Sequence, residues 1–367
     1  QTIGWGASGR NGGQVNPGLK ELPEGIISYY GPIDGERIVN LSGDAPNYVF
    51  NLIKKNRLLC DATQNGWIQA SIGRRGDSIN REVVRQYNKY KVPVELLSKN
   101  EISSLLGSDY YSGGTLDPRG GKLNPLKYIK GLAQVAQKNG TRIHENTEVL
   151  GIKKTPKGYL ISCDRGELFA TRVVLATNAY GSSENMTLNK NVIPVQSIQV
   201  ATSRLSNNIL KTILPEGHVV SDTQRLLKYF RIADNGRLLM GGRGGTSNKT
   251  IRQQIAELKN HVRKMFPELA DINFEYAWGG DIALTKDQFP HILELHNGII
   301  SLSGYNGRGV AMATVLGKVV AEYLSGTARE DLDFPIKGYK PVFFRSFQKR
   351  ALPLAIWYKK LLDRWDV

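Results

Sequence analysis

The sequence predicts an α/β (α+β) protein that contains both parallel and antiparallel strands. Three patterns support this prediction. An apolar run over 298–303 leads through a glycine-rich turn into a helix with an apolar face, 309–324, as in a strand–turn–helix unit. A second apolar run, 172–176, has the composition of a buried parallel strand. A ladder of short strands over 192–241 contains a hairpin turn at Asn235-Gly236, which indicates an antiparallel sheet.

The chain opens with a glycine-dense segment, 1–18, which we expect to form a loop. Helices with charged outer faces follow, and a later helix begins at Pro125, where proline is tolerated in the first turn. The expected helices are 47–70, 79–90, 99–106, 125–139, 249–265 and 309–324. The expected strands are 141–145, 148–155, 158–163, 167–171, 172–176, 192–203, 229–233, 237–241, 274–279 and 298–303. We expect the basic, aromatic tail to finish in a short amphipathic helix.

Composition bounds the function classes. The 367 residues can form two domains around a large core, and 40% hydrophobic with 22% charged residues is typical of a globular protein. Cys60 and Cys163 lie outside any CxxC spacing, which argues against a disulfide framework and fits a reducing, cytoplasmic compartment. The five histidines show no ligand spacing, so no metal is expected. Although the net charge is +16, the basic residues are dispersed without a nucleic-acid-binding motif, so no nucleic-acid partner is expected.

The N-terminal glycines imitate a dinucleotide-binding motif. Gly4, Gly6 and Gly9 spell GxGxxG, but that motif functions only between a strand and a helix. Only three residues precede it here, and the glycines and proline of 10–18 disfavour a helix after it. We therefore interpret the segment as a loop whose backbone N–H groups contact a phosphate. An NAD-linked dehydrogenase that uses these glycines remains an alternative.

The turn before the last apolar helix is the best physical candidate for a ligand site. A buried strand, a run of glycines and a helix N-terminus bring several backbone N–H groups and a positive helix end to one place. Gly307 and Gly309 permit a close approach of the backbone to a ligand, and Arg308 adds positive charge. The alternative is a glycine-rich crossover turn without a ligand.

Several blocks, in collinear order, resemble the D-amino-acid oxidase/sarcosine oxidase superfamily, with most similarity to the branch that contains gamma-glutamylputrescine oxidoreductase. The blocks are GWGASGRNGGQ at 4–14, LDPRGGKLNPLKYIKGLAQVAQKNG at 116–140, HENTEVLGI at 144–152, VVLATNAYG at 173–181, and WGGDIALTKDQFPHI at 278–292 followed by GIISLSGYNGRGVAMATVLGKVVAEYLSG at 298–326. Together they cover essentially the whole chain.

The resemblance implies an FAD-binding three-layer domain of the glutathione-reductase-like type, interleaved with a mixed or antiparallel substrate domain. Its FAD-binding residues would be Ser8, Gly9, Arg10, Asn11, Gly12, Gly13, Gln14, Val149, Thr177, Asn178, Gly304, Asn306, Gly307, Arg308, Gly309 and Val310. The alternatives to FAD binding are a solvated loop for Arg10 and Asn11, and an ordinary turn at the end of a strand for Thr177 and Asn178. FAD is expected to bind noncovalently, because 4–14 has no histidine and no cysteine follows Cys163.

The same resemblance implies oxidation of an amine or amino-acid C–N bond, with oxygen or another acceptor taking the electrons. The family's first βαβ unit is not found before 4–14, so we expect an N-terminally incomplete FAD domain. The alternative to an active enzyme is a truncated fragment or a non-catalytic partner subunit that no longer retains FAD. The expected division is 1–30, 117–185 and 275–330 for FAD, 31–116 and 186–274 for substrate, and 331–367 for a basic tail.

Substrate-positioning residues are expected on the central hairpin. Tyr229 and Arg231 alternate with Phe230 and therefore share one face of a strand. Trp278 is expected to line the same cavity. Packing roles are the alternatives for all three side chains. No acid–base pair is evident, which suits hydride transfer from a neutral amine, because that reaction depends on alignment. We favour docking of the tail on its own domain over contact with anionic lipid.

Overall fold

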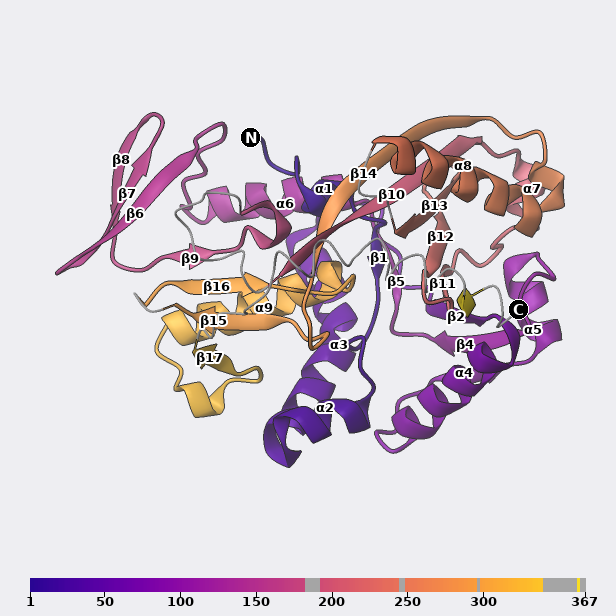
Figure 1. Ribbon diagram of the computed structural model, residues 1–367, viewed down its shortest axis with the longest axis horizontal. Helices are drawn as coiled ribbons and strands as arrows, with labels where there is room; N and C mark the ends of the chain where they lie inside the picture. The colour runs from indigo at the N-terminus through magenta and orange to yellow at the C-terminus, as the bar shows by residue number, and fades with distance from the viewer. Residues whose placement is uncertain (182–191, 244–247, 296–297, 339–361, 364–367) are drawn as a thin grey trace.

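The computed structural model describes residues 1–181, 192–243, 248–295, 298–338 and 362–363. Its largest sheet has eight strands in the order β14-β10-β13-β12-β11-β2-β4-β3 (Figure 1). Their bounds are β2 (Trp67–Ser71), β3 (Glu95–Leu97), β4 (Gly113–Asp117), β10 (Ile193–Arg204), β11 (Val219–Asp222), β12 (Lys228–Ile232), β13 (Arg237–Arg243) and β14 (Phe274–Leu284). The sheet is mixed, because β11 and β2 pair in parallel whereas the other neighbouring strands of the sheet pair antiparallel.

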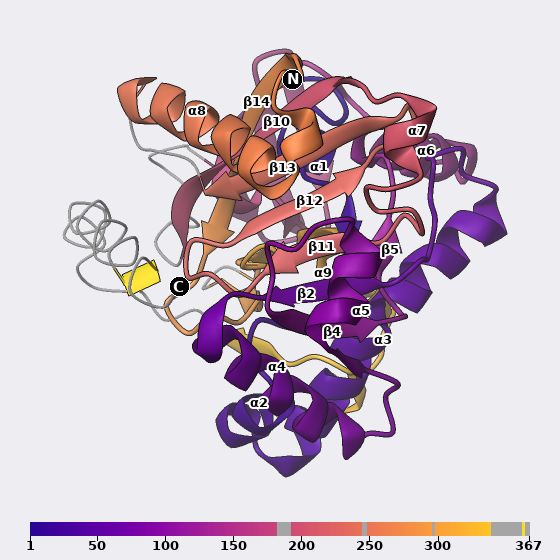
Figure 2. The ribbon, with the colours of Figure 1, turned by 90° about the vertical axis from the view of Figure 1, so that its right-hand side faces the viewer.

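The two faces of this sheet differ in polarity. Successive side chains of a strand point to opposite faces. Ile198, Val200, Phe230 and Met240 belong to a buried apolar cluster under α5 (Lys99–Leu106) and α8 (Asn248–Met265), which cover that face (Figure 2). The opposite face is polar and includes Gln199, and α4 (Gly73–Asn88) crosses one end of it. The alternation therefore provides one face for the core and one for a site.

A second core surrounds a four-stranded sheet in the order β17-β15-β16-β9. Its strands are β9 (Val174–Leu175), β15 (His291–Glu294), β16 (Ile300–Ser303) and β17 (Ile336–Gly338), and β9 is parallel to β16. The apolar helix α9 (Gly309–Leu324) buries Met312, Leu316 and Val319 here, and α3 (Pro32–Asn56) packs against it. The sequence-based division places all of α3 with the substrate domain, yet α3 shares its core with α9.

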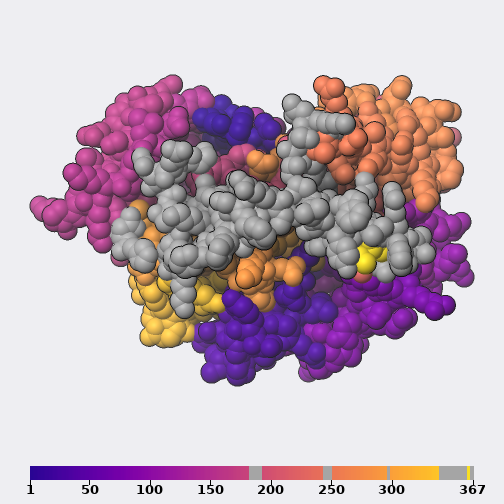
Figure 3. Space-filling view, in the orientation of Figure 1, coloured from indigo at the N-terminus to yellow at the C-terminus, as the bar shows by residue number. Residues whose placement is uncertain are grey.

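The smaller elements complete the chain. A meander of β6 (Val149–Thr155), β7 (Gly158–Cys163) and β8 (Gly166–Ala170) projects at one end of the molecule (Figures 1 and 3), with Leu150, Leu168 and Phe169 exposed. The others are β1 (Gln14–Val15) with β5 (Gly121–Lys122), the helices α1 (Ala7–Arg10), α2 (Pro23–Tyr30), α6 (Pro125–Lys138) and α7 (Asn207–Leu210), and the short 3-10 helices η1 (Asn178–Tyr180), η3 (Pro267–Leu269) and η4 (Arg329–Asp331). Among the described helices, none has the length and apolar character to cross a membrane.

Several expected elements have the expected bounds, and others are wrong. The bounds of α5, β7 and α9 agree with the expected ranges. The expected helix 47–70 is instead the end of α3 followed by β2, because Pro46 lies inside α3 and 67–71 pairs with distant strands. No strand forms over 141–145, and the strand expected at 172–176 contains only two residues. The expected tail helix lies outside the described residues, apart from Leu362 and Asp363.

Candidate functional site

A cavity of about 2190 Å³ lies between the polar face of the eight-stranded sheet, the N-terminal loop, α6 and the N-terminal end of α9. This volume exceeds the ~300–1,000 Å³ of an ordinary small-ligand pocket, so the cavity has room for a large cofactor and a small substrate. The expected cofactor residues that line it are Ser8, Arg10, Asn11, Gly12, Gln14, Val149, Thr177, Asn178, Asn306, Gly307, Arg308, Gly309 and Val310. Gly9, Gly13 and Gly304 are not among the lining residues.

The N-terminal loop folds tightly upon itself. A Cβ at Gly9 would stand 2.1 Å from the carbonyl oxygen of Gly4, so the two glycines close a turn. The Asn11 amide nitrogen donates to the Ala7 and Ser8 carbonyls, and its Oδ1 accepts from the Gly13 N–H. The loop therefore presents a fixed backbone to the cavity, while α1 remains a single turn of helix.

The eight-stranded sheet holds this loop through the carbonyl of Arg10. Trp278 Nε1 donates to that oxygen at 2.9 Å and Gln199 Nε2 at 2.6 Å, and the two donors are cross-strand partners on β14 and β10. The Arg10 guanidinium lies 4.9 Å from the Trp5 ring and donates to the Gly279 carbonyl. Trp278 does not line the cavity, so its observed contact is with the loop backbone.

Tyr229 lines the cavity beside the same loop. Its hydroxyl lies 2.8 Å from Ser197 Oγ, and its ring fits between two glycines. A Cβ at Gly12 would approach Tyr229 Cε2 to 2.6 Å, and a Cβ at Gly241 would approach Tyr229 Cζ to 2.1 Å. Burial raises the pKa of Tyr229, so the hydroxyl stays protonated at neutral pH. Glycine at both positions is what allows the ring to occupy this place.

Arg231 points to the other side of the loop. Its Nε donates to the Gly12 carbonyl at 2.6 Å, and its Nη2 donates to the Leu123 carbonyl at 3.2 Å. The side chain is 5% exposed and does not line the cavity. Burial lowers the pKa of Arg231 to about 10. Tyr229 and Arg231 are thus brought together at Gly12, with only Tyr229 in the cavity.

A hydrogen-bonded chain crosses the polar face next to Tyr229. Gln14 Nε2 donates to the Val220 and Phe230 carbonyls, and its Oε1 accepts from Ser221 Oγ at 3.1 Å. Ser221 Oγ also accepts from Trp67 Nε1 at 3.2 Å. Sequence reasoning missed Trp67, Ser221 and Gln199. The available signal for Gln199 was its position between the apolar Ile198 and Val200, which alternation places on the opposite face of the strand.

The turn that leads into α9 is fixed by amide side chains. Asn306 Oδ1 accepts from the Thr285 N–H at 2.9 Å, and its Nδ2 donates to the Gly304 carbonyl and to Thr285 Oγ1. Asn178 Oδ1 accepts from the Gly304 N–H at 3.1 Å. A Cβ at Gly304 would stand 2.2 Å from Thr285 Cγ2, so this glycine is required for packing of the turn.

The N-terminus of α9 opens into the cavity without a capping side chain. Its N-cap residue, Arg308, makes no side-chain cap, and the first turn contains no acidic residue. Arg308 instead donates to the Pro17 carbonyl at 2.8 Å and lies 4.5 Å from the Trp67 ring, and burial lowers its pKa. Gly307 has a φ of +92°, and a Cβ there would meet no protein atom within 4 Å. The arrangement suits a ligand that carries negative charge.

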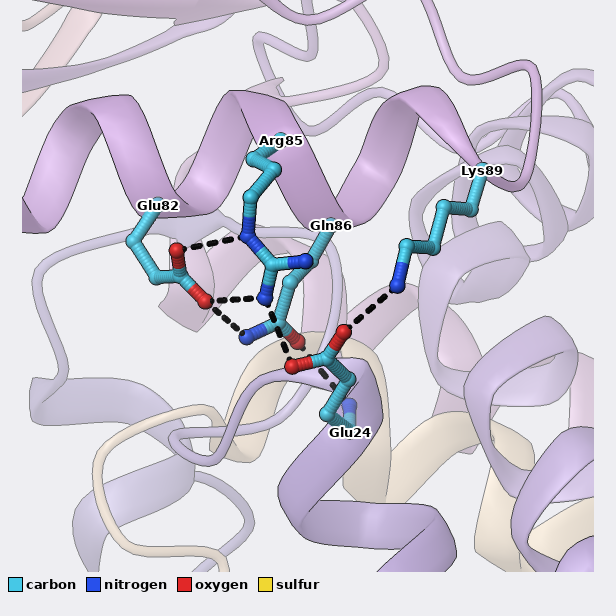
Figure 4. A network of polar contacts seen from close by, with 5 residues as sticks. All are labelled: Glu24, Glu82, Arg85, Gln86 and Lys89. Carbon is cyan, nitrogen blue, oxygen red and sulfur yellow. Dashed lines mark hydrogen bonds and ion pairs between the residues drawn. The ribbon is translucent and has the colours of Figure 1, made fainter.

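A charged network joins α2 and α4 (Figure 4). The Glu24 carboxylate of α2 accepts from Arg85 of α4 and from Lys89, the residue just after α4, each at 2.6 Å. The Glu24 backbone N–H donates to Gln86 Oε1. Glu82 accepts from Arg85 and Gln86 on the same helix. These charges are half-exposed, so each pair contributes little by itself, but together they fix α4 against α2. The α4 residues that line the cavity are Arg75, Ile79, Val83 and Tyr87.

Comparison with known proteins identifies relatives along almost the whole chain. Residues 1–323 match the model of a family described as FAD dependent oxidoreductase. A probable oxidoreductase OrdL of Rhizobium meliloti (strain 1021) is 31% identical over 371 aligned positions, which cover 99% of this chain and 85% of the relative. The gamma-glutamylputrescine oxidoreductase of Escherichia coli (strain K12) is 29% identical over 330, covering 89% and 76%.

Solved structures share the fold at lower sequence identity. Glycine oxidase from Geobacillus kaustophilus superposes with a TM-score of 0.73 at 18% identity, over 89% of this chain and 86% of that chain. Iminodiacetate oxidase from Chelativorans sp. BNC1 superposes with a TM-score of 0.72 at 17% identity, over 93% and 92%. The mixed α/β fold predicted from the sequence is thereby confirmed. Among the described residues, no group of three or more His, Cys, Asp or Glu side chains is placed to hold a metal ion.

Proposed function

The chain belongs to the family of FAD-dependent oxidoreductases, and we propose that it oxidises the C–N bond of a small amine or amino acid with FAD bound noncovalently in the cavity. Removal of a hydride from the substrate carbon needs a two-electron acceptor, and FAD would supply that chemistry when bound, with oxygen or another acceptor as the final oxidant. The imine product would then hydrolyse in water.

The observation that carries the proposal is the uncapped N-terminus of α9. Gly307 leaves open space where a side chain would otherwise project, and Gly309 begins the helix beside it. Backbone N–H groups and the positive end of α9 at this place favour negative charge, which a flavin gains on reduction. The residues at this turn therefore suit the pyrimidine edge of an FAD molecule. Gly12 and the rest of the N-terminal loop would make a second contact with the same cofactor, further along the cavity.

The chain's own residues would bind and align the reactants. The polar sheet face carries Tyr229, which we propose contacts the substrate next to Gly12. Arg231 and Trp278, which we had expected in contact with substrate, are better explained as residues that fix the loop on which the cofactor rests. Hydride transfer from a neutral amine requires alignment more than a strong base, and a rigid loop and sheet supply that alignment.

We also propose that one part of the chain binds FAD and another part binds the substrate. Segments 1–30, 117–185 and 275–330 would bind FAD, and 31–116 with 186–274 would bind substrate. The packing of α3 on α9 supports moving that helix to the FAD-binding part. The eight-stranded sheet would then cover the substrate.

The proposal is tested by the visible spectrum and by substrate-dependent bleaching. The purified protein, supplied with FAD and desalted, should retain a flavin spectrum. The test panel is the compounds in the names of the similar proteins, namely gamma-glutamylputrescine, glycine and iminodiacetate, with a non-amine alcohol as the control. One amine should bleach the flavin without oxygen, and peroxide release in air would identify an oxidase. Failure to retain FAD would refute the proposal and favour a non-catalytic subunit or fragment.

A further inference from the structure

Arg231 is a buried cation that forms no direct ion pair among the described residues, although the Asp61 carboxylate acts on it from a distance and raises its pKa against the effect of burial. It lies on β12 and is 5% exposed, and its hydrogen bonds run to two backbone carbonyls, those of Gly12 and Leu123. Two other arginines at the sheet are neutralised: Arg237 on the neighbouring strand pairs with Glu275 at 2.6 Å, and Arg119 pairs with Asp117 at 2.6 Å. Arg308 instead contacts the Pro17 carbonyl and the Trp67 ring. Arg231 therefore differs from Arg237 and Arg119 in having only backbone carbonyls as hydrogen-bond acceptors.

A buried guanidinium without a direct ion pair lowers the stability of the fold, so its presence here calls for a functional reason. Removing a guanidinium from water is costly, and backbone carbonyls return only part of its hydration. Lys122 lies nearby, and its ammonium donates to the Ile232 carbonyl at 3.1 Å. Burial lowers the pKa of Lys122, and repulsion from Arg231 lowers it further, against the attraction of Asp234. Two cations thus stand close together, and a pKa of about 10 still leaves Arg231 charged at neutral pH. Packing alone would be served as well by an uncharged side chain.

The position of the Arg231 charge, next to the loop that borders the cavity, indicates its function. A Cβ on Gly13 would lie 2.6 Å from Arg231 Nη2, so the guanidinium sits directly against the Gly12–Gly13 backbone. Gly12 lines the cavity on the other side. One stretch of backbone without side chains therefore separates the buried charge from the cavity, and in a low-dielectric interior a charge acts across such a distance.

We propose that Arg231 stabilises the reduced cofactor electrostatically. Its fixed positive charge, acting through the Gly12–Gly13 backbone, stabilises the negative charge that the cofactor gains on reduction. The inference rests on the proposed function, and it assigns to Arg231 a role different from substrate binding. It also gives a reason for a guanidinium that is buried here without a direct ion pair.

The charge and the hydrogen bonds of Arg231 are separable by substitution. Arg231→Lys keeps the charge and loses the planar fork, whereas Arg231→Gln keeps a donor for the Gly12 carbonyl and loses the charge. Arg237→Gln is the matched control, because it removes a neutralised arginine from the neighbouring strand. Two readouts on the FAD-loaded protein do not depend on turnover: the reduction potential and the affinity for sulfite, an anion that adds to oxidised flavin and leaves negative charge on it.

We expect Arg231→Gln to weaken sulfite binding by about tenfold or more and to make the reduction potential more negative. Arg231→Lys should stay within about threefold of the parent protein, and Arg237→Gln should match it. A purely structural role gives the reverse order, with Gln closer to the parent than Lys, and that order would overturn the inference. Equal sulfite affinity in all four proteins would overturn it too, whatever their melting temperatures. A parent protein that holds no FAD would refute the proposed function itself, and this inference with it.

Discussion

The assignment of the α9 turn to the cofactor can be tested with two glycines of nearly identical backbone conformation. Gly307 has a φ of +92° and Gly140, in the turn after α6, has a φ of +88°. A Cβ added at either position meets no protein atom within 4 Å. Gly307 lines the cavity, whereas Gly140 does not. Alanine at the two positions therefore imposes the same backbone strain and differs in what the methyl group can meet.

The magnitudes follow from these geometries. A side chain at positive φ costs about 1–2 kcal/mol, so both variants should lose a similar amount of stability without FAD. At Gly307 the methyl group would additionally occupy space that we assign to FAD. Overfilling of a packed contact costs about 1–3 kcal/mol, which corresponds to a fall in FAD affinity of roughly 5- to 150-fold. Gly140→Ala should leave FAD affinity unchanged.

The assay is titration of the FAD-free protein with FAD, followed by flavin fluorescence, for the parent and both alanine variants. Thermal unfolding without FAD checks that the two variants are equally destabilised. The reasoning is refuted if Gly307→Ala binds FAD as tightly as Gly140→Ala, because the turn would then be a connection and the cofactor would lie elsewhere. Gly307→Val should enlarge the difference from the control.

Burial raises the pKa of Asp222 from 3.8 to about 6. The unfolded chain therefore releases this proton at a lower pH than the folded chain does. As a result, the free energy of unfolding falls as the pH rises from about 4 to about 6. Asp222→Asn should therefore raise the free energy of unfolding by up to about 3 kcal/mol above pH 6 and by little at pH 4, measured by denaturant unfolding. The Asp363 carboxylate accepts the backbone N–H groups of Arg225 and Leu226 at 2.9 and 3.0 Å, so Asp363→Ala should accelerate hydrogen exchange of these two amides about 5- to 100-fold, and unchanged exchange would exclude docking of the tail here. Tyr229→Phe should retain FAD and lower amine turnover by about tenfold or more, while an unchanged rate would remove Tyr229 from the substrate site.

Elements with complete local signals were predictable from the sequence. Helix α5 begins at a capping box in which Ser98 and Glu101 bond reciprocally, and it ends at Gly107 in the left-handed conformation. By contrast, β2 owes its extended form to pairing with β11, about 150 residues away in the chain, and to β4. Local periodicity could not reveal those partners. The segment 141–145 has strand-forming residues but no neighbouring strand, so it remains irregular.

The site was predictable in its glycines and less so in its side chains. The α9 turn follows from a strand, glycines and a helix that are adjacent in sequence, so local reasoning placed Gly307 at the cavity. Strand alternation also placed Tyr229 and Arg231 on one face. It could not determine which of them faces the cavity, because the Gly12 loop that separates them lies more than two hundred residues earlier in the chain.

That loop couples the two functions assigned to the cavity. The carbonyl of Arg10 accepts hydrogen bonds from Gln199 and Trp278, while the next glycine carbonyl, that of Gly12, accepts from Arg231. All three donors come from the eight-stranded sheet, and the same sheet carries Tyr229 on its polar face. On the proposed assignment, a movement of the sheet would shift the loop that we place against the cofactor together with Tyr229, which we place against the substrate. One structural unit would then set the distance between the two reactants, as the proposed hydride transfer requires.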